Sequence, residues 1–374
     1  MKNNIKDLKG IRARVNSAVL VLMVVFCVTT PTHAADSLYV GDQSDNTVKR
    51  FDADSGEYLG EFIKKGNSPI KGSRGLIFNS DSDLLISNQN AGANKSGEIL
   101  KHSGVTGEFL GALVPHNSPN APFAPRGIAL SSDILFVADT SSAGKNNPPG
   151  KLMTYTKNGV FLADLTPDPI TEFPGAFSND EFHPRGVVLG PDGLLYVSVT
   201  HDLDPKSINF NPLAGWILRF DPNNNGAFVD VFASSNSGDE CAKHLHRPEG
   251  LVFSPNGELY VTAFRADSSD TDKILIFDST GACVDQIALD EPGNIRAFAQ
   301  ALLFGPANQA GESLFIPISG GGPDTGAVRR YNVTTKTFSN FVLPVSLGGS
   351  LGEGWYLTFE GTDPGTLGYI PPSN

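Results

Sequence analysis

Residues 246–287 read HRPEGLVFSPNGELYVTAFRADSSDTDKILIFDSTGACVDQI and contain four short apolar runs, each closed by a turn signal. The runs lie at 251–253, 259–262, 274–277 and 284–287. Apolar runs of this length, separated by Asn-Gly or Ser-Thr-Gly, are typical of strands joined by hairpin turns. The stretch therefore predicts a four-stranded antiparallel meander.

The same unit recurs along the chain, which indicates a repeat architecture. Its first strand carries Pro-x-Gly before an apolar run in the clearest copies, and copies lie at 73–78, 125–130, 184–189, 248–253, 299–304 and 354–359. The first unit begins at its second strand, near Ser37, while the chain ends on an extra first-strand copy. A closed ring explains both features, because the C-terminal strand then completes the N-terminal unit and leaves no open edge.

The fold class that we predict is all-β: one six-bladed β-propeller domain over residues 36–374, with four antiparallel strands in each blade. The turns between first and second strands, and between third and fourth strands, are short. The remaining loops are long and would all emerge on one face of the ring. Function usually lies on loops held by a rigid scaffold, so we place the site on this long-loop face, over the central tunnel.

Residues 1–35 are predicted to be a signal peptide that is cleaved after export. A basic start precedes an apolar run from Ala18 to Val28, which is too short to span a bilayer, and small residues follow at 34 and 35. Bulky Phe26 before Cys27 disfavours a lipoprotein signal. We therefore expect a secreted or periplasmic protein that is not inserted in a membrane.

The charge of the chain is acidic. The full sequence has a formal net charge of −12, and residues 36–374 alone carry 23 basic and 39 acidic side chains, a net charge of −16. Such a chain repels nucleic acid and anionic membrane surfaces. We expect a monomer whose partner is a small molecule or another protein.

Two cysteines remain beyond residue 35, Cys241 and Cys283. An oxidising compartment would allow them to form a disulfide. In the repeat, however, Cys241 lies in a loop between blades at one end of the meander, and Cys283 follows a turn at the opposite end. Strands of four residues separate those ends by more than about 10 Å, and a disulfide needs Cα atoms within about 7 Å. We expect the two thiols to be apart, although the compartment leaves a bridge open.

The repeated patterns Pro-x-Gly-Leu-x-Phe, Pro-Asn-Gly-x-Leu-Tyr-Val and Phe-Asp-x-x-Gly resemble those of NHL-repeat propellers. They are also similar to a wider class with gluconolactonase-like proteins, strictosidine synthase and peptidylglycine amidating lyase. The resemblance covers nearly all of residues 36–374 and is specific for architecture but weak for activity. It implies a six-bladed ring in which the residue between Pro and Gly lies at the tunnel mouth. Gluconolactonase-like enzymes hold a divalent cation there with Asp, Asn or Glu, and amidating lyases hold zinc with His.

We call these six places the ring positions, and in blade order they are occupied by Arg74, Arg126, Arg185, Glu249, Gln300 and Trp355. Guanidinium groups repel cations, so we predict no metal site and no cofactor, with calcium or zinc as an open alternative. One feature favours that alternative: the segment Leu351-Gly352-Glu353-Gly354 resembles the Gly-Glu-Gly opening of gluconolactonase-like chains.

The ring positions are our predicted ligand-binding residues. Arginine is always charged and can hold a carboxylate or phosphate with two hydrogen bonds, so three arginines on consecutive blades favour an anion pocket. The structural alternative is that each arginine fills the mouth and pairs with a neighbouring carboxylate, for example Arg185 with Glu249. The first hypothesis is thus a recognition module that binds an anionic small molecule or a partner protein.

The alternative hypothesis is a gluconolactonase-like hydrolase or lyase that acts at the tunnel mouth on a lactone or sugar acid. Its candidate catalytic residues are His183, His246, Glu249 and Glu353, because a histidine or carboxylate near the mouth could act as a general base. A propeller that serves only as a scaffold is the third hypothesis. The sequence does not decide whether the protein is an enzyme.

Overall fold

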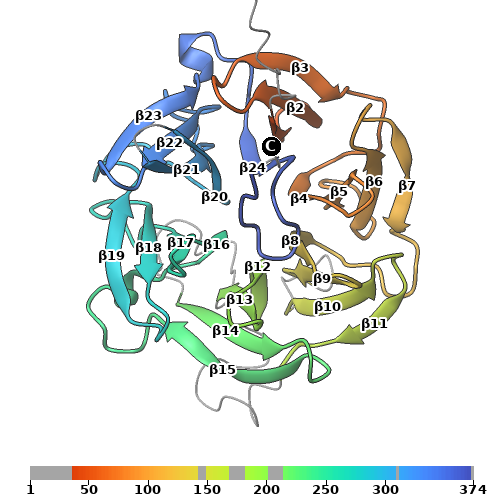
Figure 1. Ribbon diagram of the computed structural model, residues 1–374, viewed down its shortest axis with the longest axis horizontal. Coiled ribbons are helices and arrows are strands. Elements are labelled where there is room, and N and C mark those ends of the chain that lie inside the picture. The colour runs from red at the N-terminus through yellow and green to blue at the C-terminus, as the bar shows by residue number, and fades with distance from the viewer. Residues whose placement is uncertain (1–35, 142–148, 168–181, 201–213, 309–310, 372–374) are drawn as a thin grey trace, which may run out of the picture. The chain divides into compact units, whose positions relative to one another are not determined.

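The computed structural model describes residues 36–141, 149–167, 182–200, 214–308 and 311–371. These described residues form one compact unit. It contains six antiparallel sheets of four strands each, arranged as blades around a centre (Figure 1). The predicted all-β, six-bladed propeller is confirmed. The predicted signal peptide, residues 1–35, lies outside the described residues.

Blade 1 consists of β24, β1, β2 and β3 from the centre to the rim, and blades 2 to 6 each use four consecutive strands in sequence order from the centre to the rim. The innermost strands are β24 (Gly354–Phe359), β4 (Ser73–Phe78), β8 (Pro125–Leu130), β12 (His183–Leu189), β16 (Leu251–Phe253) and β20 (Leu303–Asn308). The second strands are β1 (Ser37–Asp42), β5 (Asp83–Asn88), β9 (Ile134–Asp139), β13 (Leu195–Thr200), β17 (Leu259–Ala263) and β21 (Gly311–Pro317). The third strands are β2 (Thr47–Asp52), β6 (Glu98–Ser103), β10 (Lys151–Thr156), β14 (Gly215–Asp221), β18 (Lys273–Phe277) and β22 (Val328–Asn332). The outer strands are β3 (Tyr58–Ile63), β7 (Phe109–Val114), β11 (Phe161–Asp164), β15 (Ala227–Ser234), β19 (Cys283–Ala288) and β23 (Thr337–Val342).

The C-terminal strand closes the ring as predicted. β24 pairs antiparallel with β1, with Leu38 opposite Phe359. Asp42, the last residue of β1, accepts hydrogen bonds from the backbone N–H groups of Gly352 at 2.7 Å and Glu353 at 2.9 Å, just before β24. Its carboxylate also binds the Lys49 ammonium at 2.5 Å, and both side chains are buried. The Asp42 carboxylate, which the buried Lys49 neutralises, thus ties the closing segment to the first blade.

Neighbouring blades are joined by repeated aromatic contacts. An aromatic residue of one blade's second strand packs edge-on against the phenylalanine of the next blade's first-strand motif, with ring centroids about 5 Å apart. The contacts are Tyr39–Phe78, Tyr196–Phe253, Tyr260–Phe304 and Phe315–Phe359. The phenylalanine of the repeated first-strand motif is therefore an interblade residue.

The glycine of the motif allows the innermost strands to approach closely. A Cβ atom added at Gly127 would lie 2.8 Å from the Arg185 carbonyl oxygen and 2.9 Å from the Gly186 Cα. A Cβ atom at Gly186 would likewise lie 2.4 Å from the Glu249 carbonyl oxygen. Real Cβ atoms are not found at such distances from backbone, so glycine sets the narrow width of the ring.

The C-terminal segment after β24 covers one end of the tunnel. It crosses the centre of the ring in Figure 1, and its carbonyl groups at Pro364 and Gly365 accept hydrogen bonds from Leu130 and Leu189, at the ends of β8 and β12. Leu367 lines a small apolar cavity of about 40 Å³ inside the tunnel. The tunnel is therefore plugged at the face opposite the long loops.

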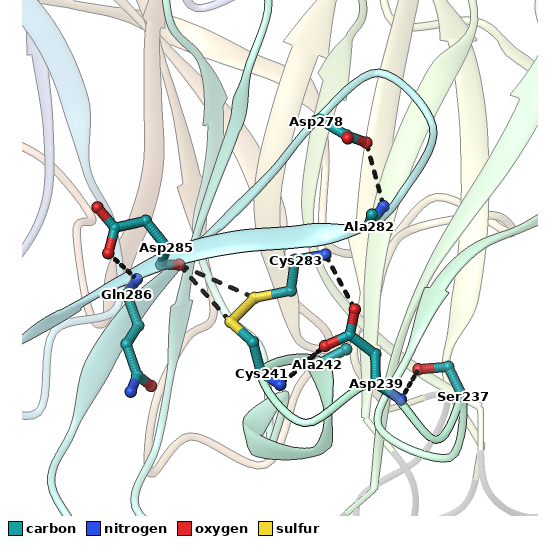
Figure 2. The surroundings of a disulfide bond; sticks show 9 residues. All are labelled: Ser237, Asp239, Cys241, Ala242, Asp278, Ala282, Cys283, Asp285 and Gln286. Carbon is teal, nitrogen blue, oxygen red and sulfur yellow. Dashed lines mark hydrogen bonds between the residues drawn. A yellow bond between two sulfur atoms is a disulfide. The ribbon is translucent and has the colours of Figure 1, made fainter.

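The expectation that Cys241 and Cys283 lie apart is wrong: they form a disulfide, with Cα atoms 5.5 Å apart (Figure 2). A meander with flat blades places them at opposite ends, but the blades twist. The outer strands consequently follow the rim, and the end of β15 meets the start of β19 (Figure 1). The Asp239 carboxylate holds the junction by accepting hydrogen bonds from the backbone N–H groups of Cys241 at 2.7 Å and Cys283 at 3.4 Å.

We predict that Asp42→Asn destabilises the ring by about 3 kcal/mol at pH 7, because it removes one partner of a buried ion pair. Burial alone would raise the pKa of Asp42, but its hydrogen bonds from Lys49, Ser44 and the backbone outweigh burial and lower it. The stabilisation is then present above about pH 4 and lost as the pH falls through the lowered pKa. Urea unfolding at pH 7 and pH 3 measures this, and the gap between wild type and variant should narrow at pH 3. A gap that widens at pH 3 contradicts the assignment.

We also predict that Gly127→Ala costs about 2 kcal/mol of unfolding free energy, because the added methyl group meets backbone atoms of the next blade. Gly368→Ala is the matched control, since its nearest neighbour is the Thr366 hydroxyl at 3.3 Å. Chemical denaturation of both variants measures the difference. Equal stability would show that the innermost strands are not in tight contact.

Candidate functional site

The ring positions lie where the chain enters the innermost strands. Arg74, Arg126, Arg185 and Trp355 are within β4, β8, β12 and β24, whereas Glu249 and Gln300 precede β16 and β20. All six therefore lie at the entry ends of the innermost strands, on the long-loop face. The loops that lead into the innermost strands determine how close these six side chains come to one another.

A polar side chain at the end of the second strand fixes the entry loop. Asp139, at the end of β9, accepts hydrogen bonds from the backbone N–H groups of Phe123 at 2.7 Å and Ala124 at 2.6 Å, just before Arg126. Asn88, at the end of β5, accepts the corresponding bond in blade 2. Asp42, at the end of β1, accepts such bonds in blade 1. These bonds position the ring side chains, because they hold the backbone immediately before them.

Three arginines surround the carboxylate of Glu249. Arg185 Nη1 lies 2.5 Å from Oε1, Arg126 Nη1 lies 3.1 Å from Oε2, and Arg247 Nε lies 3.8 Å from Oε1. Arg126 reaches across the tunnel from blade 3 and also donates to Gln300 Oε1 of blade 6 at 2.9 Å. We call these five residues the arginine cluster. The pairing of Arg185 with Glu249, which the structural alternative named, is present.

Arg74 has other bonding partners than the Glu249 carboxylate. Its guanidinium carbon is 3.8 Å from the ring centroid of Trp355, a cation–π contact. It also donates to Gln43 Oε1 at 2.8 Å. The indole N–H of Trp355 donates to Glu353 Oε1 at 2.9 Å. The Arg74 guanidinium and the Glu353 carboxylate thus both contact the indole of Trp355.

Burial and neighbouring charges shift the pKa values of these side chains. Burial would raise the pKa of Glu249, but the charges of Arg126, Arg185 and Arg247 outweigh burial and hold it below its ordinary value. Burial is the main reason why the pKa of Arg74 is lowered to about 9 and that of Arg185 is well below its ordinary value. The repulsion from the neighbouring charge of Arg126 is the second reason in both cases.

Several donors of the cluster have no hydrogen-bond acceptor within the described chain. They are Arg126 Nε, Arg185 Nε, Arg185 Nη2, Arg247 Nε and Gln300 Nε2. Arg185 is fully buried and Gln300 is 2 % exposed. A buried donor without a partner costs roughly 1–3 kcal/mol, and more when it is charged. All these atoms can only donate, so the group that would satisfy them is an acceptor.

Two residues beside the mouth were not predicted from the sequence. Arg247 and Phe298 adopt left-handed backbone conformations, with φ of 44° and 51°. Phe298 is held there by its N–H bond to Asp272 at 2.8 Å and by the Ser319 hydroxyl on its carbonyl at 2.8 Å. Such strain is typical of functional sites. Arg247 directly precedes Pro248 of the first-strand motif, and this position in the sequence could have indicated that it lies at the mouth. No sequence feature indicated the position of Phe298.

The four catalytic candidates have different surroundings. Glu249 binds arginines and Glu353 binds Trp355, as above. His183 is fully buried, with Nδ1 2.7 Å from the Thr140 carbonyl oxygen. Burial lowers the pKa of His246. Within the described residues no group of three or more His, Cys, Asp and Glu is close enough to hold a metal ion.

Comparison with known proteins supports the fold alone. No family model matches the chain, and no curated protein matches it. A chain of the nidogen/laminin complex is 14 % identical, with 87 % of this chain and 98 % of that chain covered and a TM-score of 0.55. A protein of unknown function from Bacteroides caccae is 13 % identical over 87 % and 99 %, with a TM-score of 0.50. The periplasmic gluconolactonase of Pseudomonas aeruginosa is 18 % identical over 82 % of each chain, with a TM-score of 0.49.

We predict that Glu249→Gln lowers the unfolding free energy by about 3–5 kcal/mol, because it leaves buried guanidinium groups without their counter-charge. Glu258→Gln, in the turn between β16 and β17 of the same blade, is the matched control and should change stability by less than about 0.5 kcal/mol. Urea unfolding at neutral pH measures both. Equal stability of the two variants would contradict the role of Glu249 as the centre of the cluster.

Proposed function

We propose that this protein is a recognition propeller that binds a small anionic molecule at the arginine cluster. The observation that carries this proposal is the excess of buried positive charge: three guanidinium groups around one carboxylate, with donor atoms left over. Such an excess is costly in the free protein. An anion bound to the partly exposed guanidinium groups of Arg126 and Arg247 would offset this charge, which favours its binding.

Access to the cluster is from the long-loop face. The side chains of Arg126 and Arg247 are 12 % and 16 % exposed, whereas that of Glu249 is 1 % exposed. Trp355 and Phe298 are also partly exposed. A ligand from solvent would therefore meet guanidinium groups and aromatic edges before it meets the carboxylate.

The hydrolase or lyase alternative draws less support from this geometry. A general base works best with a pKa near the operating pH, and the surrounding arginines move the pKa of Glu249 away from that value. His183 is fully buried. The propeller of the nidogen/laminin complex assembles with another protein, so a partner protein that presents an acidic side chain to the same arginines is the second candidate.

We propose that the protein is exported to the periplasm or the cell exterior. The basic start and short apolar run of residues 1–35 support export. The disulfide between Cys241 and Cys283 supports an oxidising compartment. Among the described residues no helix is long and apolar enough to cross a membrane.

A thermal-shift screen with small organic anions and with calcium or zinc tests the proposal. We predict that anions raise the melting temperature by about 2 °C or more at tenfold excess over Kd, through preferential binding to the folded state. Arg126→Gln should weaken this response. Arg219→Gln should keep it, because Arg219 pairs with Asp230 of the outer strand β15.

Two outcomes would contradict the proposal. Stabilisation by calcium or zinc alone, without response to any anion, would point to a metal site. Indifference to every small molecule would point to the protein partner instead.

A further inference from the structure

The charges of the arginine cluster define the charge of its ligand. Arg126, Arg185 and Arg247 carry three positive charges, and Glu249 contributes one negative charge. Arg74 and Glu353, which both contact Trp355, add one charge of each sign and leave the sum unchanged. Arg296, the next arginine along this face, is neutralised by the buried carboxylate of Asp272 at 2.8 Å. The surplus is therefore two positive charges.

The unsatisfied donors approach the cluster from several directions. Arg126 comes from blade 3, Arg185 from blade 4, Arg247 from the loop into blade 5, and Gln300 from the loop into blade 6. A carboxylate offers two oxygens in one plane and suits donors that approach from one side. A tetrahedral oxyanion offers three or more oxygens around an axis and suits donors distributed around a ring.

The residues around the arginine cluster preorganise it for binding. Arg247 keeps a left-handed backbone beside Pro248, and the loop that carries it is anchored by the disulfide and by Asp239 at the rim (Figure 2). Asp139 fixes the backbone before Arg126. Preorganised donors bind an anion without losing further conformational entropy, which favours binding.

We infer, resting on the proposed function, that the ligand of the arginine cluster carries a dianionic tetrahedral oxyanion, such as a phosphate monoester or a sulfate group. The oxyanion neutralises the surplus charge and accepts from the partly exposed guanidinium groups of Arg126 and Arg247, while Glu249 stays paired with Arg185. A monocarboxylate leaves one positive charge of the surplus without a counter-charge.

Titration calorimetry with sulfate, methyl phosphate and acetate, at constant ionic strength and at pH 5 and pH 7.5, tests this inference. Sulfate is a dianion at both pH values, so its Kd should be the same at both. The second ionisation of a phosphate monoester lies near pH 6, so methyl phosphate should bind about tenfold more tightly at pH 7.5. Acetate should bind at least about tenfold more weakly than sulfate, since it makes fewer charge-assisted bonds.

Variants assign the effect to the cluster. Gln300→Glu replaces a donor by a carboxylate and should weaken sulfate binding by about tenfold or more. Arg219→Gln at the rim should leave it unchanged. The pH comparison on the wild-type protein decides the question even if Gln300→Glu fails to fold.

The possible failures are distinguishable. Acetate that binds as tightly as sulfate, or methyl phosphate whose Kd is the same at both pH values, overturns the dianion inference and leaves the anion site standing. No binding of any of the three anions overturns both.

Discussion

The glycine of the first-strand motif packs against the backbone of the next blade, and the arrangement of the tunnel mouth depends on this contact. A Cβ atom at Gly186 would lie 2.4 Å from the Glu249 carbonyl oxygen, so no larger residue fits there without displacing the backbone. The narrow ring lets Arg126 cross from blade 3 to Gln300 of blade 6. It also brings Arg185 and Arg247 to the one carboxylate of Glu249. The charge concentration thus follows from the backbone packing of the repeat.

This concentration of charge is a poor way to stabilise a fold. A buried ion pair seldom stabilises more than apolar residues of similar size, and here the arginines outnumber the carboxylate. The strain at Arg247 and Phe298 adds a further cost of about 1–3 kcal/mol for each residue. Repeated aromatic contacts between blades, such as Tyr39 with Phe78, provide stability elsewhere. A costly polar cluster on a well-packed scaffold is typical of a binding site.

The sequence predicted the fold well because propeller repeats encode it locally, through turn residues, strand alternation and the Pro-x-Gly motif. It also identified the ring positions, since they differ among copies of the same motif. It failed for the Cys241–Cys283 disulfide, because the twist of the blades is a three-dimensional property that a flat meander ignores. The crossing of Arg126 and the backbone strain at Phe298 were likewise inaccessible, because they depend on contacts between residues far apart in the chain.

The most direct test of an anion site at the arginine cluster is an anomalous difference map from a crystal of this protein soaked in selenate, a heavier relative of sulfate. The account predicts a peak within about 4 Å of the guanidinium groups of Arg126 and Arg247, the distance of a charge-assisted contact. A map with selenium bound elsewhere on the protein and none at this cluster would contradict it.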